Sequence, residues 1–301
     1  MQDHNIIIEV IPPSRSSSED YTNKIADRIV DVVNEMKGVS AVNIPEIVEE
    51  NHLGLPYYKN FDNRKFGLLL REKCSKDLII NTVVVYKPME EFQQWLDESM
   101  NYGINKFVFV GAKMKSIKYP GLGVADANSI AKGKKACVGN ILIPERENEA
   151  DRMVSKTISG CNFFTTQILF EPKKICGILG NYSAKCSSSG LKPAKIFLSF
   201  APVSGIEDIT FIKWLGAEIQ EATERRLKDA KDTEKESINI VVEALHEIFE
   251  YAEKNSISVP LGLNFEYLTL RNLELSKSLT NTLSDFKTEN YLKKLAAKAS
   301  W

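Results

Sequence analysis

Residues 160–171 read GCNFFTTQILFE, a mostly apolar run that contains the side-chain amide of Gln167. Phe163 and Phe164 are adjacent instead of alternating with polar residues, so the run predicts a strand that is covered on both faces, as in a parallel sheet. Covered parallel strands require helices packed against the sheet. The same kind of run recurs along the chain, and this stretch therefore sets the fold class.

Eight such runs alternate with stretches of helical spacing, in which residues such as Ala26, Ile29, Val30 and Val33 fall at offsets of three and four. Eight strand–helix units favour an α/β fold of the (β/α)8 TIM-barrel type, predicted as a single catalytic domain over residues 1–301. An open doubly wound sheet is the alternative. The predicted strands are Ile6–Val10, Ser40–Ile44, Leu78–Tyr86, Lys106–Gly111, Ala136–Ile143, Asn162–Gln167, Lys195–Phe200 and Leu261–Phe265.

Composition and charge exclude several functional classes. The 301 residues carry a formal net charge of −1 with a pI near 6.4, so no overall charge attracts nucleic acid or an anionic membrane, and we expect a small-molecule partner. The five cysteines form no CxxC pair and the chain has three histidines, so neither a disulfide framework nor a metal site is predicted. The start MQDHN has no basic segment followed by an apolar h-region, and no run approaches about 18 apolar residues. We therefore expect a cytoplasmic protein that does not span a membrane.

Two segments depart from the even repetition. Residues 218–237 are heavily charged and precede an apolar helical stripe from Ile238 to Ala252, which predicts an exposed helical turn or mobile loop followed by a long helix before the last strand. Residues 53–65, LGLPYYKNFDNRK, form a polar and aromatic connection after the second strand. This connection lies on the side where barrel sites occur, so it either closes over a ligand or is an ordinary surface loop.

Candidate chemistry lies at the strand ends, beginning with Glu9 and Gln167. Glu9 stands inside the apolar run IIIEVIPPSR, where desolvation would raise the pKa of its carboxyl and make it a proton donor near neutral pH. The amide of Gln167 offers a donor and an acceptor, which suits the edge of a pterin or flavin ring at the carboxyl end of a barrel strand. The structural alternatives are an outward Glu9 paired with a Lys or Arg, and a Gln167 that serves at an edge or hinge.

Two further strand ends carry charged and amide groups. After the fifth predicted strand, residues 144–152 read PERENEADR, a mixed-charge cluster in which Arg146 is suited to a carboxylate or phosphate; the alternative is an ordinary charged helix start. Near the end of the last strand, Asn264 and Glu266 are candidates to bind a ligand's amino group, unless Glu266 forms a salt bridge to a nearby helix.

Several common catalytic signatures are missing. The segment YPGLGVADA at residues 119–127 has Asp126 where the dinucleotide fingerprint would have its third glycine, and it follows a polar loop instead of a strand. The sequence holds no Walker A loop and no GxSxG elbow, and none of its histidines lies at a predicted strand end. These absences disfavour hydrolase and metalloenzyme functions.

Taken together, the strand ends resemble those of methylenetetrahydrofolate reductases. Four segments carry the resemblance: EVIPPSR at 9–15, AVNIPE at 41–46, PERENEA at 144–150 and FTTQILFE at 164–171. The likeness covers most of residues 5–272 and is closest to the flavin-independent branch described from mycobacteria. It implies a barrel that reduces 5,10-methylenetetrahydrofolate to 5-methyltetrahydrofolate in one-carbon metabolism, at the carboxyl face of the strands.

The resemblance also implies roles for individual residues. Glu9 matches the glutamate that supplies the proton opening the imidazolidine ring to a 5-iminium ion, and Gln167 matches a glutamine that contacts the pterin. Lys156 matches a lysine near the cofactor phosphates of flavoenzymes, which here would serve a nicotinamide dinucleotide.

The chain departs from the flavin-containing members at positions near the flavin. Lys113 stands in place of an aspartate after the fourth strand, and Pro45 replaces a threonine at the end of the second. Ile143 and Glu147 replace a tyrosine and a histidine that flank the proline of the fifth strand. These departures predict that FAD is absent; a flavin bound in a different way is the alternative.

The sequence thus predicts a reductase that passes hydride from NADH or NADPH directly to a methylene-pterin, of the tetrahydrofolate or the methanopterin type. The residues assigned to these roles are Glu9 for catalysis; Gln167, Glu266 and Asn264 for the substrate; and Lys156, Arg146 and Lys113 for the cofactor. Two alternatives remain. One is an FAD-dependent reductase, and the other is a barrel that binds a folate without turnover as the partner of a methyl-transferring complex.

Overall fold

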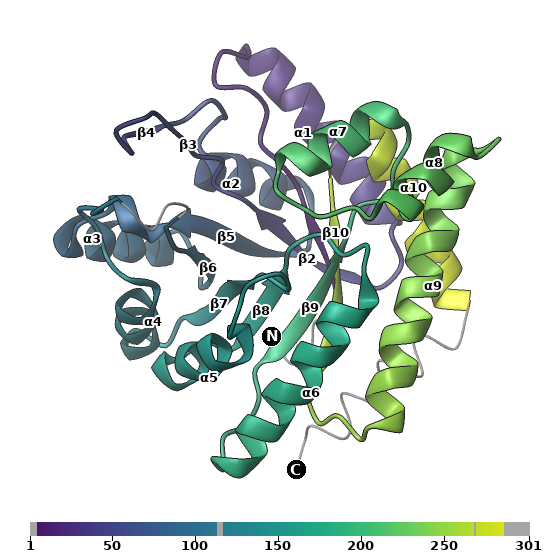
Figure 1. The fold of residues 1–301 in the computed structure, drawn as a ribbon. Helices are drawn as coiled ribbons and strands as arrows, with labels where there is room; N and C mark the ends of the chain where they lie inside the picture. Colours follow the sequence, from purple (N-terminus) through teal and green to yellow (C-terminus); the bar gives the residue numbers. More distant parts are fainter. Residues whose placement is uncertain (1–4, 113–116, 268, 286–301) are drawn as a thin grey trace.

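Eight parallel strands close into a barrel with helices around its outside in a computed structural model, which describes residues 5–112, 117–267 and 269–285 (Figure 1). The order of strands around the barrel is β1-β10-β9-β8-β7-β6-β5-β2, and β2 pairs with β1 to complete the circle. The predicted (β/α)8 barrel is therefore confirmed, and the open doubly wound sheet is excluded. The barrel strands are β1 (Ile6–Glu9), β2 (Val39–Ile44), β5 (Asp77–Val83), β6 (Lys106–Val110), β7 (Cys137–Leu142), β8 (Phe163–Thr166), β9 (Lys195–Phe200) and β10 (Leu261–Glu266).

Each barrel strand is followed along the chain by at least one helix. A short antiparallel pair, β3 (Glu49–Glu50) and β4 (Pro56–Tyr57), is inserted between β2 and the next helix. The helices are α1 (Glu19–Glu35), α2 (Asn63–Lys73), the 3-10 turn η1 (Val84–Tyr86), α3 (Met89–Asn101), α4 (Val124–Gly133), α5 (Glu149–Ser159), α6 (Pro172–Ser188), α7 (Ile206–Trp214), α8 (Glu221–Asp229), α9 (Thr233–Lys254) and α10 (Leu270–Asp285).

Side-chain alternation along the strands explains how the barrel is filled. Residues that point outward, such as Ile8 and Val42, belong to the large cluster that packs against the helices. A separate interior cluster contains Ile7, Ala41, Ile79, Val108, Phe163 and Phe197. Gly139 on β7 makes room for this layer, because a Cβ at that position would lie 2.4 Å from the ring of Phe163.

Seven of the eight predicted strands agree with the structure to within one residue at each end, and the third ends earlier than predicted. Residues Val84–Tyr86 form η1 instead of extending β5. The backbone of Gly121 packs against this turn, with its N–H donating to the carbonyl of Val85 at 2.8 Å. A Cβ on Gly121 would lie 2.5 Å from the backbone nitrogen of Lys87. Gly121, the first glycine in YPGLGVADA, therefore permits a close backbone contact.

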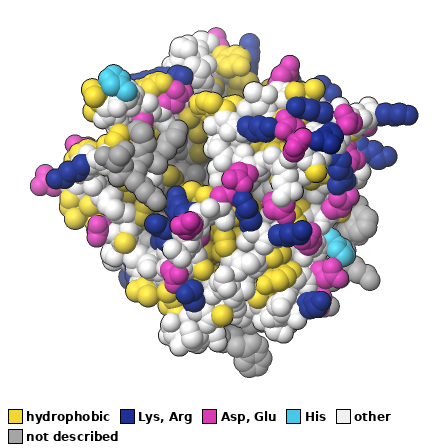
Figure 2. Space-filling view, in the orientation of Figure 1, with side chains coloured by type: hydrophobic (Ala, Val, Ile, Leu, Met, Phe, Trp, Pro, Cys, Tyr) yellow, Lys and Arg dark blue, Asp and Glu magenta, His cyan; other side chains and the backbone are white. Residues whose placement is uncertain are grey.

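The charged segment 218–237 is largely helical. It contains α8 and the start of α9, so the predicted helical region before the last strand is confirmed. Arg226 on α8 forms ion pairs with Glu236 at 2.5 Å and Glu243 at 2.8 Å on α9, which hold the two helices together. None of the described helices combines the length and apolar character needed to cross a membrane. On the face shown in Figure 2, Lys and Arg are intermixed with Asp and Glu.

Candidate active site

A ring of polar side chains lies at the carboxyl ends of the strands, just beyond the apolar interior layer. Because side chains alternate, Glu9 points inward two residues after Ile7, and Asn43 points inward two residues after Ala41. We call this set the polar ring, and its members are Glu9, Asn43, Asn81, Thr165, Ser199, Asn264 and Glu266. The carboxyl face is where (β/α)8 barrels build their sites.

Glu9 is the carboxyl around which the ring is organised. Asn43 donates a hydrogen bond from Nδ2 to Glu9 Oε2 at 2.6 Å. Burial raises the pKa of Glu9 to about 7, although hydrogen bonds from Asn43 and Asn264 act in the opposite direction. No described Lys or Arg forms a salt bridge with Glu9, so no cation restores the charged form. A carboxyl with this pKa can donate a proton near neutral pH.

Glu266 lies directly opposite Glu9 in the register of β1 and β10. Burial, and then the nearby charge of Glu9, raise the pKa of Glu266 well above its usual value, while a hydrogen bond from Ser199 lowers it. Two adjacent half-buried carboxyls resist ionising together. The raised pKa values favour a shared proton on the pair near neutral pH, and Glu266 forms no salt bridge with any described residue, which was its alternative.

Several buried acceptors of the polar ring have no hydrogen-bond partner among the described residues. They are Asn43 Oδ1, Asn81 Oδ1, Asn264 Oδ1 and Thr165 Oγ1. The Nδ2 of Asn264 donates to Ser199 Oγ at 2.9 Å, which leaves the oxygen of the same amide unused. A buried polar group without a partner costs about 1–3 kcal/mol. A ligand with several N–H donors along one edge would satisfy these oxygens.

Gln167 follows the last residue of β8 at the same mouth of the barrel. Its Nε2 lies 3.5 Å from the carbonyl oxygen of Leu215, just beyond α7, and its backbone N–H donates to Leu142 at 2.9 Å. Gly216 has φ +91° and passes close to the amide, since a Cβ there would lie 3.3 Å from Nε2. The Oε1 of Gln167 accepts no hydrogen bond from a described residue, so this acceptor is open to a ligand.

The predicted cofactor group after β7 is arranged around a buried carboxylate. Glu149 is 2% exposed, and its oxygens lie 3.7 Å from Arg146 and 3.8 Å from Lys156. Lys156 also donates to the carbonyl of Ile141 at 2.8 Å. Burial lowers the pKa of Lys156, and the charge of Glu149 opposes that shift. Lys156 therefore connects α5 to β7, whereas Arg146, with 34% of its side chain exposed, can still meet a ligand.

The structure thus brings Glu9, Asn264 and Glu266 together in one ring. Lys113 lies outside the described residues. Sequence reasoning did not identify Asn43, which holds the Glu9 carboxyl, or Asn81 in the neighbouring strand. The sequence does carry a signal for these two residues, because each amide stands two residues after a small or branched apolar residue of the same strand. This spacing places the amide on the inward face of the barrel once the register of the strands is known.

Comparisons with known proteins bear on the family and the fold of the chain. A family model described as mycobacterial methylenetetrahydrofolate reductase matches residues 4–245. Among solved structures, an uncharacterized protein from Clostridium thermocellum that binds two copies of 5-methyl-5,6,7,8-tetrahydrofolic acid is similar, with a TM-score of 0.76 and 20% sequence identity. That likeness covers 94% of this chain and 95% of the other, and it concerns the fold. No curated protein matches the sequence.

Proposed function

The chain belongs to the mycobacterial methylenetetrahydrofolate reductase family, and from this premise we propose that it reduces 5,10-methylenetetrahydrofolate to 5-methyltetrahydrofolate with hydride from NADH or NADPH. The observation that carries the proposal is the adjacent pair of Glu9 and Glu266, whose pKa values are raised by burial, inside a ring of open amide acceptors. The ligand of the clostridial neighbour supports a tetrahydrofolate over a methanopterin-type carrier.

Glu9 supplies the proton that makes the substrate electrophilic. Protonation of N10 breaks the bond between N10 and the bridging carbon, and the electron pair of N5 forms the 5-iminium ion. The carboxylate left on Glu9 stabilises the new positive charge. A pKa of about 7 suits this step, because an acid of that strength is substantially protonated at neutral pH and still releases its proton readily.

One hydride then completes the reduction. A bound reduced nicotinamide would supply it, and the addition of one proton and one hydride converts the methylene bridge into a methyl group on N5. The polar ring contributes by orienting the pterin, whose amino and ring N–H groups match the open oxygens of Asn43 and Asn264. Gln167 supplies a further acceptor at the mouth.

The residues after β7 are compatible with a dinucleotide phosphate. Arg146, Lys156 and Glu149 together carry a formal charge of +1, and Arg146 is the reachable member of the three. The buried Oε2 of Glu149 has no hydrogen-bond partner among the described residues, so Arg146 can turn toward a phosphate without breaking a hydrogen bond to it. In this proposal Lys156 positions the end of β7 and does not contact the cofactor.

Turnover by flavin-free protein tests the proposal. The purified protein is mixed with NADH or NADPH and 5,10-methylenetetrahydrofolate, and the loss of reduced nucleotide is compared with the 5-methyl product formed. We expect equal amounts of the two. Nucleotide consumption without product, or no reaction, contradicts the proposed function.

Two other functions give different results in simple measurements. An FAD-dependent reductase would release stoichiometric flavin on heating, detected by fluorescence, whereas we expect colourless protein because Lys113, Ile143 and Glu147 replace flavin-contacting residues. The binding of a methylated folate by the clostridial neighbour favours, as a second candidate, a barrel that holds folate without converting it. Such a protein would bind the pterin and give no turnover.

A further inference from the structure

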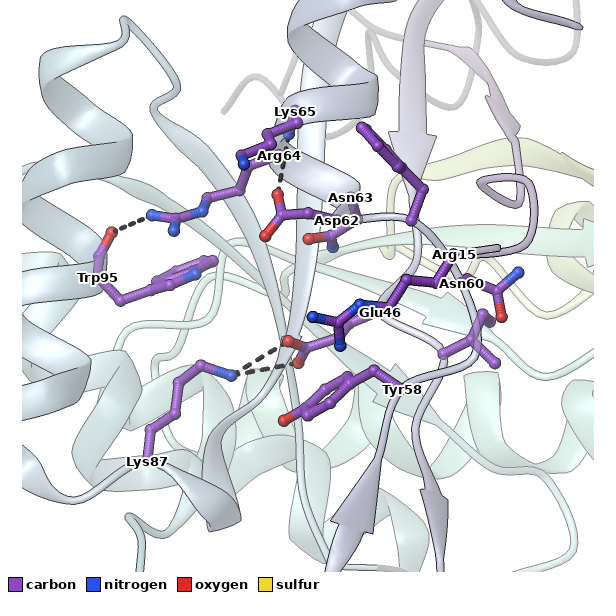
Figure 3. Close-up of a pocket in the computed structure, with 12 residues that line it drawn as sticks. Arg15, Glu46, Tyr58, Asn60, Asp62, Asn63, Arg64, Lys65, Lys87 and Trp95 are labelled. Atoms are coloured by element: carbon purple, nitrogen blue, oxygen red, sulfur yellow. Dashed lines mark hydrogen bonds and ion pairs between the residues drawn. The ribbon is translucent and has the colours of Figure 1, made fainter. Parts of the chain in front are cut away.

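A cavity of about 550 Å³ lies beside the barrel mouth, outside the polar ring (Figure 3). Its walls come from segments that follow β1, β2 and β5, from residues 58–65, and from α3. Its volume lies within the range of small-molecule sites. Its charged lining consists of four cations and two acids: Arg15, Arg64, Lys65 and Lys87 with Glu46 and Asp62.

Both acids in the cavity wall already have structural partners. Glu46 accepts hydrogen bonds from the backbone N–H of Val83 at 2.6 Å and from Lys87 at 3.2 Å. Asp62 caps α2 by accepting from the backbone N–H of Lys65 at 2.9 Å. The negative charges are thus directed at the end of β5 and the start of a helix, and Lys87 is held in the ion pair with Glu46.

Two of the cations have no acidic partner among the described residues, namely Arg15 and Lys65. The guanidinium of Arg15 points into the cavity beside the ring of Tyr58, toward the ion pair of Lys87 and Glu46 (Figure 3). On the facing wall, the guanidinium of Arg64 lies 5.4 Å from the centre of the Trp95 ring. Arg64 also pairs with Glu98 at 3.3 Å, so the positive charge of the cavity that no described acid compensates belongs to Arg15 and Lys65.

The cavity is also close to the proposed chemistry. Glu46 stands three residues beyond Asn43, the residue that holds the Glu9 carboxyl, so the two are separated by roughly 10 Å of extended chain. This is on the order of the length of the p-aminobenzoyl unit that joins a folate's pterin to its first glutamate. A ligand with its ring in the mouth can therefore place an anionic extension among Arg15, Lys65 and Arg64.

We propose that this cavity is an anion-binding subsite for the extension of a ligand whose ring occupies the barrel mouth; the inference rests on the proposed function for the identity of that ligand. Carboxylates of an oligo-γ-glutamate tail and phosphates of a dinucleotide share the required chemistry. Both carry several negative charges on a flexible chain, which suits Lys and Arg donors spread around a space of this size.

The test compares Arg15→Gln/Lys65→Gln with the control Lys192→Gln/Lys254→Gln. The control removes the same charge from exposed lysines in the segments that lead into the amino-terminal ends of β9 and β10. Calorimetry gives the affinities of monoglutamyl and triglutamyl tetrahydrofolate, of NADH, and of p-aminobenzoyl-tri-γ-glutamate, a probe without a pterin.

We expect wild type and control to bind the triglutamyl form about fivefold to tenfold more tightly than the monoglutamyl form, and the cavity variant to bind both equally. The preference should fall as salt is added. If the tail preference survives in the cavity variant while its NADH affinity falls by a similar factor, the subsite takes the phosphates. Equal behaviour of the cavity variant and the control with every ligand overturns the proposal.

The pterin-free probe separates this inference from the proposed function. If the wild-type protein binds the probe but gives no turnover, and if Arg15→Gln/Lys65→Gln loses probe binding, the subsite is supported and the reductase activity is contradicted. If the protein turns over, and if the cavity substitutions leave its affinities for the probe, for folate and for NADH unchanged, the subsite alone is contradicted.

Discussion

Glu9 and Glu149 both lie where the barrel strands end, but different groups surround their side-chain carboxyls. Glu149 has Arg146 and Lys156 within 4 Å and accepts a hydrogen bond from the backbone N–H of Ile143. Glu9 has amides and a second carboxyl around it. A buried carboxyl must be compensated, either by cations or by keeping its proton. The first arrangement stabilises structure, and the second stores a proton for chemistry.

Replacing Glu9 gives the largest effect expected from this comparison. Glu9→Gln keeps the shape of the side chain and a partner for Asn43, but it removes the transferable proton. We expect turnover to fall by about 10²-fold or more, as for the loss of a positioned general acid. Circular dichroism and pterin affinity should remain close to those of wild type.

The matched control for Glu9→Gln is Glu253→Gln, at an exposed position near the end of α9. This change should leave turnover within about twofold of wild type, since exposed substitutions have small effects. If Glu9→Gln behaves like Glu253→Gln, Glu9 is not the acid and the contrast between the two carboxyls has no chemical meaning.

Glu149→Gln is expected to affect stability more than chemistry. The change leaves the largely buried Lys156 without its carboxylate, and we expect the free energy of unfolding to fall by about 3 kcal/mol. Urea unfolding of this variant is compared with that of Glu147→Gln, a neighbouring exposed position. A large loss of turnover per folded molecule, with unchanged stability, would reverse the roles we assign to Glu149 and Glu9.

The strands and the position of Glu9 could be predicted from the sequence, because burial inside the barrel restricts which residues can occur there. Continuous apolar runs predicted the strands, and a lone carboxyl in one of them identified Glu9. Val84–Tyr86 resembles a strand, yet hydrogen bonds from residues 121 and 122, distant in sequence, bend it into a turn. The match to a family lysine placed Lys156 near phosphates, whereas the structure turns its ammonium toward Ile141.

The rest of the site depended on register and distant contacts. Asn43 occurs in an apolar strand whose sequence does not specify which neighbour its amide meets. The cavity is built from five separated parts of the chain, beginning at Arg15 and ending at Trp95. No local pattern brings these parts together, since their approach is set by how α2 and α3 pack on the barrel.

Gln167→Glu tests whether ligand binding at the barrel mouth requires the amide of Gln167. A carboxylate offers acceptors but no donor for the carbonyl of Leu215, and it adds negative charge at the barrel mouth. We expect pterin binding to weaken by about 1–3 kcal/mol while dinucleotide affinity changes much less. Titration of each ligand into this variant and into Gln93→Glu, an exposed control on α3, measures the difference. The opposite pattern would assign Gln167 to the cofactor.

Glu266→Gln gives the smallest expected effect, a shift in pH dependence. The charge of Glu9 raises the pKa of Glu266, so the last proton of the pair is tightly held and is shared by both carboxyls, and replacing Glu266 removes this shared proton. Activity that requires protonated Glu9 should then be lost at lower pH, with the alkaline limb of kcat/KM moving down by about one pH unit. An unchanged limb would show that the two carboxyls titrate independently.

The central claim, that Glu9 keeps its proton near neutral pH, is tested most directly by infrared difference spectroscopy of wild type minus Glu9→Gln. The carbonyl stretch of a protonated carboxyl is followed as the pH is raised from about 5 to about 9, a range that brackets the shifted pKa but not the ordinary one. We predict a band that is present at the acidic end and disappears with a midpoint of about 7. A band that is already absent at the acidic end would contradict the account.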